Sequence, residues 1–173
     1  MKLICLGLFF IYFDIPVEIG SRTVGILPAF VGYLIIIYGV SSLKSTFPAM
    51  EKLKSIAGVG AVLEFFCFLL PLLNVGFGVG LEGKFFLGLQ TAVPVVLTYH
   101  IVNAIRLAEK SRQWDLRGGL VLAFWVVLTV CNLAIYVVNL TAMGSTMIPL
   151  VGMVICLVFL GTLLMVERWQ KEG

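Results

Sequence analysis

Two ionisable side chains lie inside long apolar stretches of this sequence. Glu64 is near the middle of the stretch 56–74, and His100 lies in the stretch 85–105. An ionised carboxylate at the centre of a bilayer costs at least ~2.5–3.5 kcal/mol, so Glu64 should face other helices and be protonated or paired. Histidine titrates near neutral pH, and burial shifts the pKa of both groups. A Glu64–His100 pair would therefore have the chemistry of a proton relay.

Two further polar side chains extend this candidate site. Asn103 follows His100 by about one helical turn, and Gln90 lies earlier in the same stretch. A short Gly-rich turn joins the two stretches, which predicts antiparallel neighbours with Glu64 and His100 at similar depth. We interpret these four residues as a ligand or proton path for small-solute binding or transport, with proton or cation coupling as one option. The alternatives are a scaffold or partner subunit, in which the residues only tie helices together, and a membrane-embedded enzyme.

A second polar group, at the opposite side of the membrane, consists of Asp14, Glu18 and Arg22. On a continuous helix these residues would stack at i, i+4 and i+8. The group is either a solvated or self-paired loop or the mouth of a solute path.

Signatures of enzymes and metal sites are weak. No nucleophile, base and orienting acid occur in a recognisable arrangement. Cys5, Cys67, Cys131 and Cys156 lie in apolar runs without a CxxC pair, and the chain has 1 histidine. We therefore expect no enzyme activity, no metal and no cofactor.

Composition indicates a membrane protein. The chain has 173 residues, of which 61% are hydrophobic and 12% charged, and its mean hydropathy is +1.11. A soluble domain could not bury so much apolar surface. We predict one all-α integral membrane domain with six transmembrane helices, at about 3–19, 24–43, 56–74, 85–105, 118–138 and 147–166. The first helix is short or kinked at Pro16, and we expect it to be retained because no small-x-small cleavage motif follows it.

The distribution of positive charge predicts the orientation. Of the 12 Lys and Arg residues, all except Arg22 and Lys84 lie in alternate connecting or terminal segments. This asymmetry predicts a multi-pass protein of the cytoplasmic (inner) membrane with both termini in the cytoplasm. The lipid bilayer is the expected partner. A homo-oligomer or a partner membrane subunit is compatible with the sequence, whereas the scattered basic residues do not indicate nucleic acid.

The stretch 24–43 is predicted to be the central packing helix. Gly25, Gly32 and Gly39 recur at a spacing of seven, with Ala29 on the same face. Small residues in lipid mark the places where helix backbones approach closely.

The segment 13–39 resembles the N-terminal signature of a poorly characterised family of small multi-pass bacterial membrane proteins. In that family an acidic turn precedes a Leu-Pro-acid-aromatic-x-Gly-Tyr run that opens the second helix. The matching residues here are Asp14, Gly25, Leu27, Pro28, Phe30, Gly32 and Tyr33. Ala29 stands where the family has an acid. The resemblance implies the membrane fold but no known activity.

Overall fold

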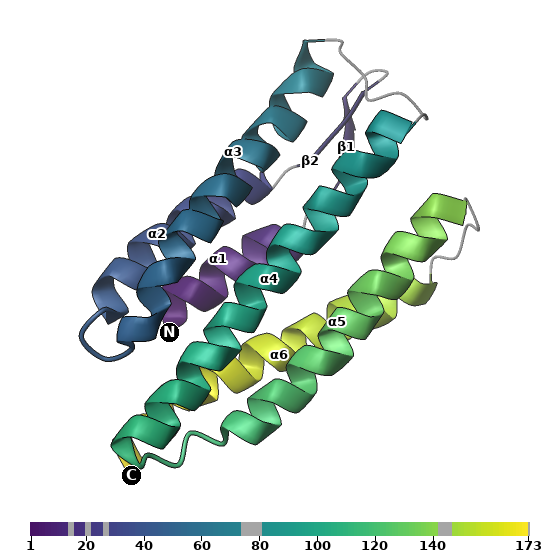
Figure 1. Ribbon diagram of the computed structural model, residues 1–173. Helices are drawn as coiled ribbons and strands as arrows, with labels where there is room; N and C mark the ends of the chain where they lie inside the picture. Colours follow the sequence, from purple (N-terminus) through teal and green to yellow (C-terminus); the bar gives the residue numbers. More distant parts are fainter. Residues whose placement is uncertain (14–15, 20–21, 26–27, 74–80, 142–146, 173) are drawn as a thin grey trace.

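The computed structural model describes residues 1–13, 16–19, 22–25, 28–73, 81–141 and 147–172. Its elements are six α-helices, one short 3-10 helix and one β-hairpin (Figure 1). Their bounds are α1 Lys2–Tyr12, β1 Pro16–Ile19, β2 Arg22–Gly25, α2 Ala29–Leu43, η1 Pro48–Lys52, α3 Leu53–Leu72, α4 Leu81–Arg112, α5 Gly118–Thr141 and α6 Met147–Glu172. The predicted all-α class is confirmed.

Four of these helices are long and apolar enough to cross a membrane. They are α3, α4, α5 and α6, whose apolar windows have mean hydropathies between 1.6 and 2.4. The other two are shorter: α1 has 11 residues and α2 has 15, so they extend ~16 Å and ~22 Å against ~30 Å of hydrocarbon. The described chain thus provides four full-length apolar helices and two partial ones.

The region between α1 and α2 corrects two predicted helices. Residues 16–19 and 22–25 form antiparallel strands, with Val17 opposite Val24 and Glu18 opposite Thr23. The predicted helix 3–19 therefore ends at Tyr12, and the predicted helix 24–43 begins at Ala29. Pro16 cannot donate a helical hydrogen bond, and the β-branched residues that follow it favour strands. The apolar residues of this segment therefore belong to strands and not to a helix.

The six helices form a closed ring around a buried core. Each helix packs against the next one in the sequence, and α6 also packs against α1. The α4 side chains Leu97, Ile101 and Ile105 recur every four residues and are fully buried. Their spacing places them on one inward face of the helix.

Glycines allow α1 and α2 to approach at backbone distance. A Cβ atom on Gly7 would lie 2.5 Å from the carbonyl oxygen of Gly32, and one on Gly32 would overlap the carbonyl oxygen of Gly7. About two turns further along α2, Gly39 faces Leu3 and Ile4 of α1. Gly32 and Gly39 thus pack against α1. Gly25 lies in β2, outside this strip, and Ala29 is the first residue of α2.

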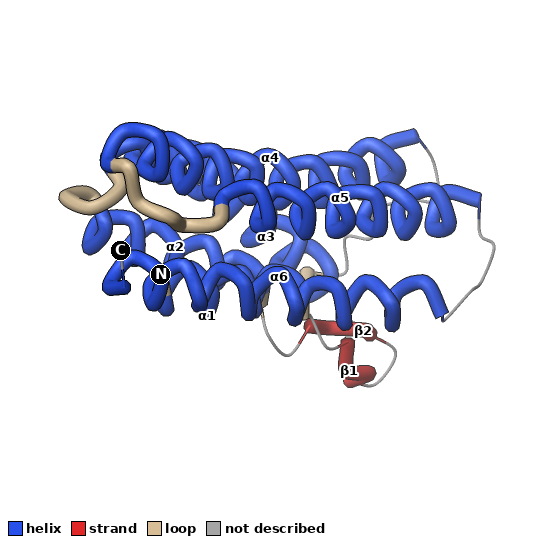
Figure 2. Tube along the Cα trace, turned by 90° about the horizontal axis from the view of Figure 1, so that it is seen from below, coloured by secondary structure: helices blue, strands red, loops and turns tan. Residues whose placement is uncertain are grey.

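Both chain ends and two polar connections gather at one end of the bundle, which we call the basic end (Figure 2). Arg112 Nη2 donates to Ser45 O over 2.9 Å, which joins the end of α4 to the connection after α2. Arg117 lies over the Trp169 ring, which joins the start of α5 to the end of α6.

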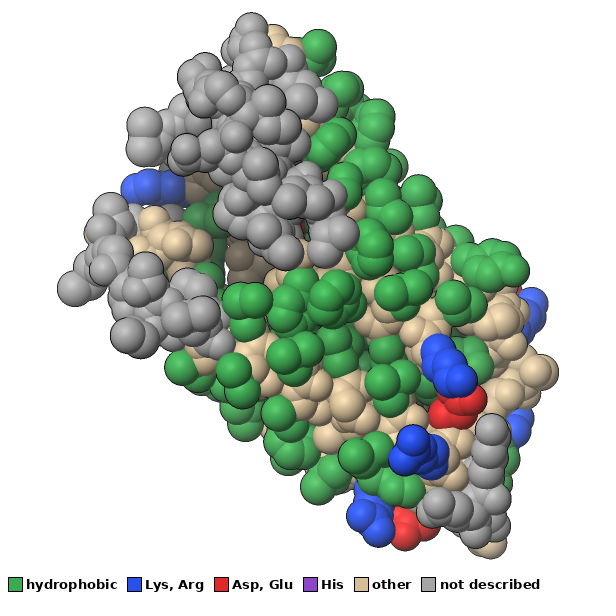
Figure 3. All heavy atoms as spheres, turned by 180° about the vertical axis from the view of Figure 1, so that it is seen from behind, with side chains coloured by type: hydrophobic (Ala, Val, Ile, Leu, Met, Phe, Trp, Pro, Cys, Tyr) green, Lys and Arg blue, Asp and Glu red, His purple; other side chains and the backbone are tan. Residues whose placement is uncertain are grey.

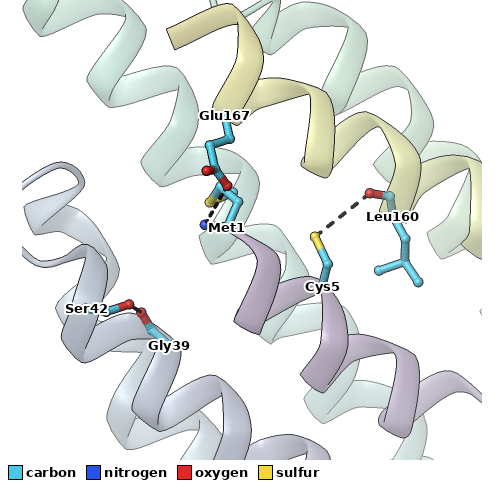
Figure 4. Close-up of polar contacts among 6 residues, drawn as sticks. All are labelled: Met1, Cys5, Gly39, Ser42, Leu160 and Glu167. Carbon is cyan, nitrogen blue, oxygen red and sulfur yellow. Dashed lines mark hydrogen bonds and ion pairs between the residues drawn. The ribbon is translucent and has the colours of Figure 1, made fainter. Parts of the chain in front are cut away.

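The start of α1 is attached to α6 at the same end. Met1 N lies 3.7 Å from Glu167 Oε2, and the Cys5 thiol is 3.9 Å from Leu160 O (Figure 4). These contacts hold α1 between α2 and α6.

Candidate functional site

Glu64 and Gln90 form a direct contact between α3 and α4. Gln90 Nε2 donates to Glu64 Oε2 over 3.2 Å, and both side chains are half-buried. Glu64 follows the start of α3 at Leu53 by eleven residues, or ~16 Å of helix. This distance is the same as the length of α1, which has 11 residues. The Glu64 carboxylate and the end of α1 at Tyr12 are therefore about equally far along their helices from the basic end.

One tyrosine hydroxyl, that of Tyr33, lies near this pair, and a second, that of Tyr12, lies near the first. Tyr33 of α2 is fully buried, and its hydroxyl is within electrostatic range of the Glu64 carboxylate and the Tyr12 hydroxyl. Neither phenol oxygen has a hydrogen-bond partner within the described part of the chain, although both oxygens are buried. An unsatisfied buried polar group costs ~1–3 kcal/mol, so these two groups require an explanation.

Glycine 60 positions the Tyr33 ring. A Cβ atom added to Gly60 would overlap the aromatic carbons of Tyr33, so the ring lies directly on the α3 backbone. Gly60 precedes Glu64 by four residues and therefore shares its helical face. Any larger residue at position 60 would displace the phenol from the carboxylate.

A second polar contact lies between α4 and α5. Trp125 Nε1 donates to Thr98 Oγ1 over 3.1 Å, and Thr98 Oγ1 donates to Pro94 O over 2.8 Å. Thr98 is also the polar side chain beside the Tyr12 hydroxyl, but the geometry between them falls short of a hydrogen bond. The hydroxyl of Thr98 is therefore already engaged on both sides.

Aromatic rings border the site at the start of α2. The Phe30 ring centroid lies 5.5 Å from that of Phe65 and 5.7 Å from that of Phe68. Phe68 follows Glu64 by one helical turn. Along α3, Glu64 thus lies between Gly60, on which the Tyr33 ring packs, and Phe68 of this phenylalanine cluster.

His100 and Asn103 lie elsewhere on α4. His100 follows Gln90 by ten residues, which is ~15 Å along the helix toward the basic end. Its ring contacts Tyr99 edge-on at 5.6 Å, and Asn103 lines a cavity near the end of α4. The α4 group bonded to Glu64 is therefore Gln90. His100 therefore lies ~15 Å along α4 from the level of Glu64, because the Gln90–Glu64 contact shows that α4 extends beyond the start of α3 at the basic end, so distances counted from the two helix ends are not comparable. A functional role for His100 and Asn103 stays a prediction.

The outer polar group does not form the predicted helical stack. Glu18 lies in β1 and Arg22 in β2, where Ile19 is paired with Arg22 and Glu18 with Thr23. Asp14 lies outside the described residues. The hairpin therefore brings the backbones of positions 18 and 22 close together, but by strand pairing.

The tyrosines are the site residues that the sequence did not single out by their chemistry. In the sequence, Tyr33 belongs to the run that carries the family resemblance, and Tyr12 lies near the end of an apolar run. A useful signal was available, because tyrosine in a membrane usually lies at the lipid–water interface with its hydroxyl in water. Both tyrosines lie on the two short helices, away from the basic end.

The described residues contain no group of three or more His, Cys, Asp or Glu side chains that could hold a metal ion. No protein-family model, curated protein or solved structure matches the chain. The function must therefore be argued from the arrangement of the side chains.

Proposed function

We propose that the protein binds a small polar solute or ion and moves it across the cytoplasmic membrane. The observation that carries this proposal is a pair of buried tyrosine hydroxyls that have no hydrogen-bond partner among the described residues: that of Tyr33, near the Glu64–Gln90 contact, and that of Tyr12, near Tyr33. Polar groups inside a bilayer are costly, and in membrane proteins they commonly mark substrate or ion pathways. A solute with hydrogen-bonding groups would satisfy both hydroxyls when bound.

The interrupted segment beside the site supports transport. α1 ends at Tyr12, a hairpin follows, and α2 begins at Ala29 without a side-chain cap. Non-helical backbone at membrane depth is tolerated where it is buried in protein or lines a water-filled cavity. Transporters commonly place their binding sites at such discontinuous helices. Here α1 ends at Tyr12, whose hydroxyl has no hydrogen-bond partner in the part of the chain that the structure describes.

The proposed topology has both termini in the cytoplasm. The basic end carries Lys and Arg side chains from four chain segments, and cytoplasmic segments are enriched in these residues. In this arrangement α3 to α6 cross fully. The α1–hairpin–α2 segment would provide the other two crossings, with the strands extending the reach of the short helices.

A scaffold or partner subunit is the second candidate. The direct Gln90–Glu64 hydrogen bond favours it, because such a bond can tie α3 to α4 without any solute. The two functions differ in what the tyrosine hydroxyls do.

A thermal-shift panel in detergent tests the proposal. The panel comprises small amines, amino acids, sugars and monovalent cations, each tested on the wild type and on Tyr33→Phe and Glu64→Gln. A solute that binds only the folded protein raises the melting temperature of the protein. At a solute concentration one hundred times its Kd, the free energy of unfolding increases by ~2.7 kcal/mol. We expect at least one class to stabilise the wild type and both variants to lose that effect.

Tyr38→Phe is the matched control, because Tyr38 is on the same helix but is 71% exposed. This variant should respond as the wild type does, and the stabilising solute should be taken up by proteoliposomes. If no class of solute stabilises the wild type more than it stabilises Tyr33→Phe, the proposed binding site is wrong and the scaffold candidate is favoured.

A further inference from the structure

The last two turns of α4 border a cavity at the basic end. Its volume is about 360 Å³, and it is lined by Asn103, Arg106, Leu107, Glu109 and Lys110. Its lining residues lie about four turns or more from Gln90 along the helix, so it is separate from the site around Glu64.

Two of the lining side chains are positively charged and have no anionic partner among the described residues. Arg106 and Lys110 are exposed, one turn apart, and form no hydrogen bond or ion pair within the described residues. The neighbouring arginines differ. Arg112 donates to Ser45 O and lies 4.8 Å from the Trp114 ring, and Arg117 lies 5.1 Å from the Trp169 ring.

The carboxylate that lines the cavity is directed to another helix. Glu109 Oε1 accepts a hydrogen bond from Gly118 N over 3.1 Å, at the first residue of α5. A negative charge is favourable at a helix N-terminus, where it meets the positive end of the helix dipole. Gly118 allows this approach, because a Cβ atom there would overlap the Glu109 carboxylate and lie 2.9 Å from Arg106 Cγ. The cavity therefore retains the charge of Arg106 and Lys110.

An apolar strip continues from these charges along the outer face of α4. Leu107, Tyr99 and Val96 are all exposed, and their spacing places them on the face that also carries Asn103 and Lys110. Figure 3 shows the same division on the opposite side of the molecule, where most charged side chains gather at one end of a broad hydrophobic surface. A ligand for this face needs an anionic head and an apolar tail.

We infer that this cavity binds the phosphate headgroup of an anionic membrane phospholipid, with Arg106 and Lys110 contacting the phosphate and Leu107 contacting the first part of an acyl chain. Basic pockets beside helices at the cytoplasmic surface attract such headgroups. The adjoining apolar strip favours a lipid over free phosphate, since an acyl chain can cover the exposed Leu107 and Val96 whereas phosphate cannot.

Native mass spectrometry of the detergent-solubilised protein tests this inference, with phosphatidylglycerol, phosphatidylcholine and inorganic phosphate as probes. We expect phosphatidylglycerol to bind in preference to phosphatidylcholine. Each lost charge should weaken binding about fivefold, so Arg106→Gln with Lys110→Gln should weaken it by about 25-fold. Leu107→Asn should also weaken phosphatidylglycerol binding while leaving the charge unchanged.

Lys52→Gln with Arg168→Gln is the matched control. It removes one Lys and one Arg from exposed positions at the same end, outside the cavity. An equal loss of affinity in this control would show diffuse attraction and overturn the inference. Equal binding of phosphatidylcholine would also overturn it, as would displacement of the lipid by inorganic phosphate at the same concentration. The inference stands apart from the proposed transport function, because these variants leave Glu64, Gln90 and Tyr33 intact.

Discussion

Gln90 on α4 donates a 3.2 Å hydrogen bond to the carboxylate of Glu64 on α3. The bond joins two neighbouring members of the helix ring, and the fully buried Tyr33 of α2 lies within electrostatic range of the same carboxylate. Residue 64 therefore contributes both to the packing of three helices and to the polarity of the interior. Suitable substitutions separate these two contributions.

Replacing Glu64 with alanine should destabilise the protein by ~1–3 kcal/mol, because the Gln90 amide loses its acceptor inside the bundle. Glu64→Gln should have a much smaller effect, since the glutamine side-chain oxygen still accepts the bond. Melting temperature in detergent measures both variants. Equal melting temperatures for alanine and glutamine variants would show that the bond contributes nothing to stability.

Replacing Gly32 with alanine should destabilise the α1–α2 pair. The new methyl group would overlap Gly7 O and lie 2.9 Å from Ile11 Cγ1, and overpacking of this kind costs ~1–3 kcal/mol. Gly58→Ala is the control, because a Cβ atom at Gly58 has no neighbour within 4 Å. A Gly32→Ala protein that melts like Gly58→Ala would disprove the close approach of these helices.

The proposed orientation can be tested by labelling single cysteines in intact cells. Cysteines at Ser45 and Gln113, which are exposed at the basic end, should react with a membrane-impermeant thiol reagent only after the membrane is permeabilised. A cysteine at Lys84, exposed in the first turn of α4, should react in intact cells. The wild-type protein, with its four native cysteines, gives the background. Labelling of Gln113→Cys in intact cells would contradict the proposed topology.

The sequence predicted the helices better than the site. Helices α3, α5 and α6 begin within three residues of the predicted positions, because long apolar runs with at most one charged residue have few alternatives in lipid. The segment around Pro16 was predicted as helix because its apolar content resembles that of a span, whereas its β-branched residues form a hairpin. The relative depth of Glu64 and His100 was the other difference: counting from the helix ends assumes that α3 and α4 end at the same level, whereas the Gln90–Glu64 contact shows that α4 extends beyond the start of α3.

The contacts that define the site depend on tertiary packing. Nothing in the local sequence indicates that Tyr33 lies on Gly60, or that Gly7 faces Gly32. Such pairs are set by the crossing of helices that are distant in the sequence. The polar character of Glu64 and Gln90 could be recognised in advance, but the contribution of α1 and α2 required the structure.

The most direct test of the transport account is an infrared titration of Glu64 in lipid bilayers. Difference spectra between the wild type and Glu64→Gln isolate the carboxyl signal, recorded from mildly acidic to mildly alkaline pH. A proton- or cation-linked path requires the side chain to exchange with the aqueous phase, so we expect the signal to change between its protonated and ionised forms. We also expect Tyr33→Phe to shift the midpoint of that change, because the Tyr33 ring packs on Gly60, one helical turn before Glu64. A carboxyl signal that stays constant over this range, in both the wild type and Tyr33→Phe, would contradict the transport account and leave Glu64 as a structural tie.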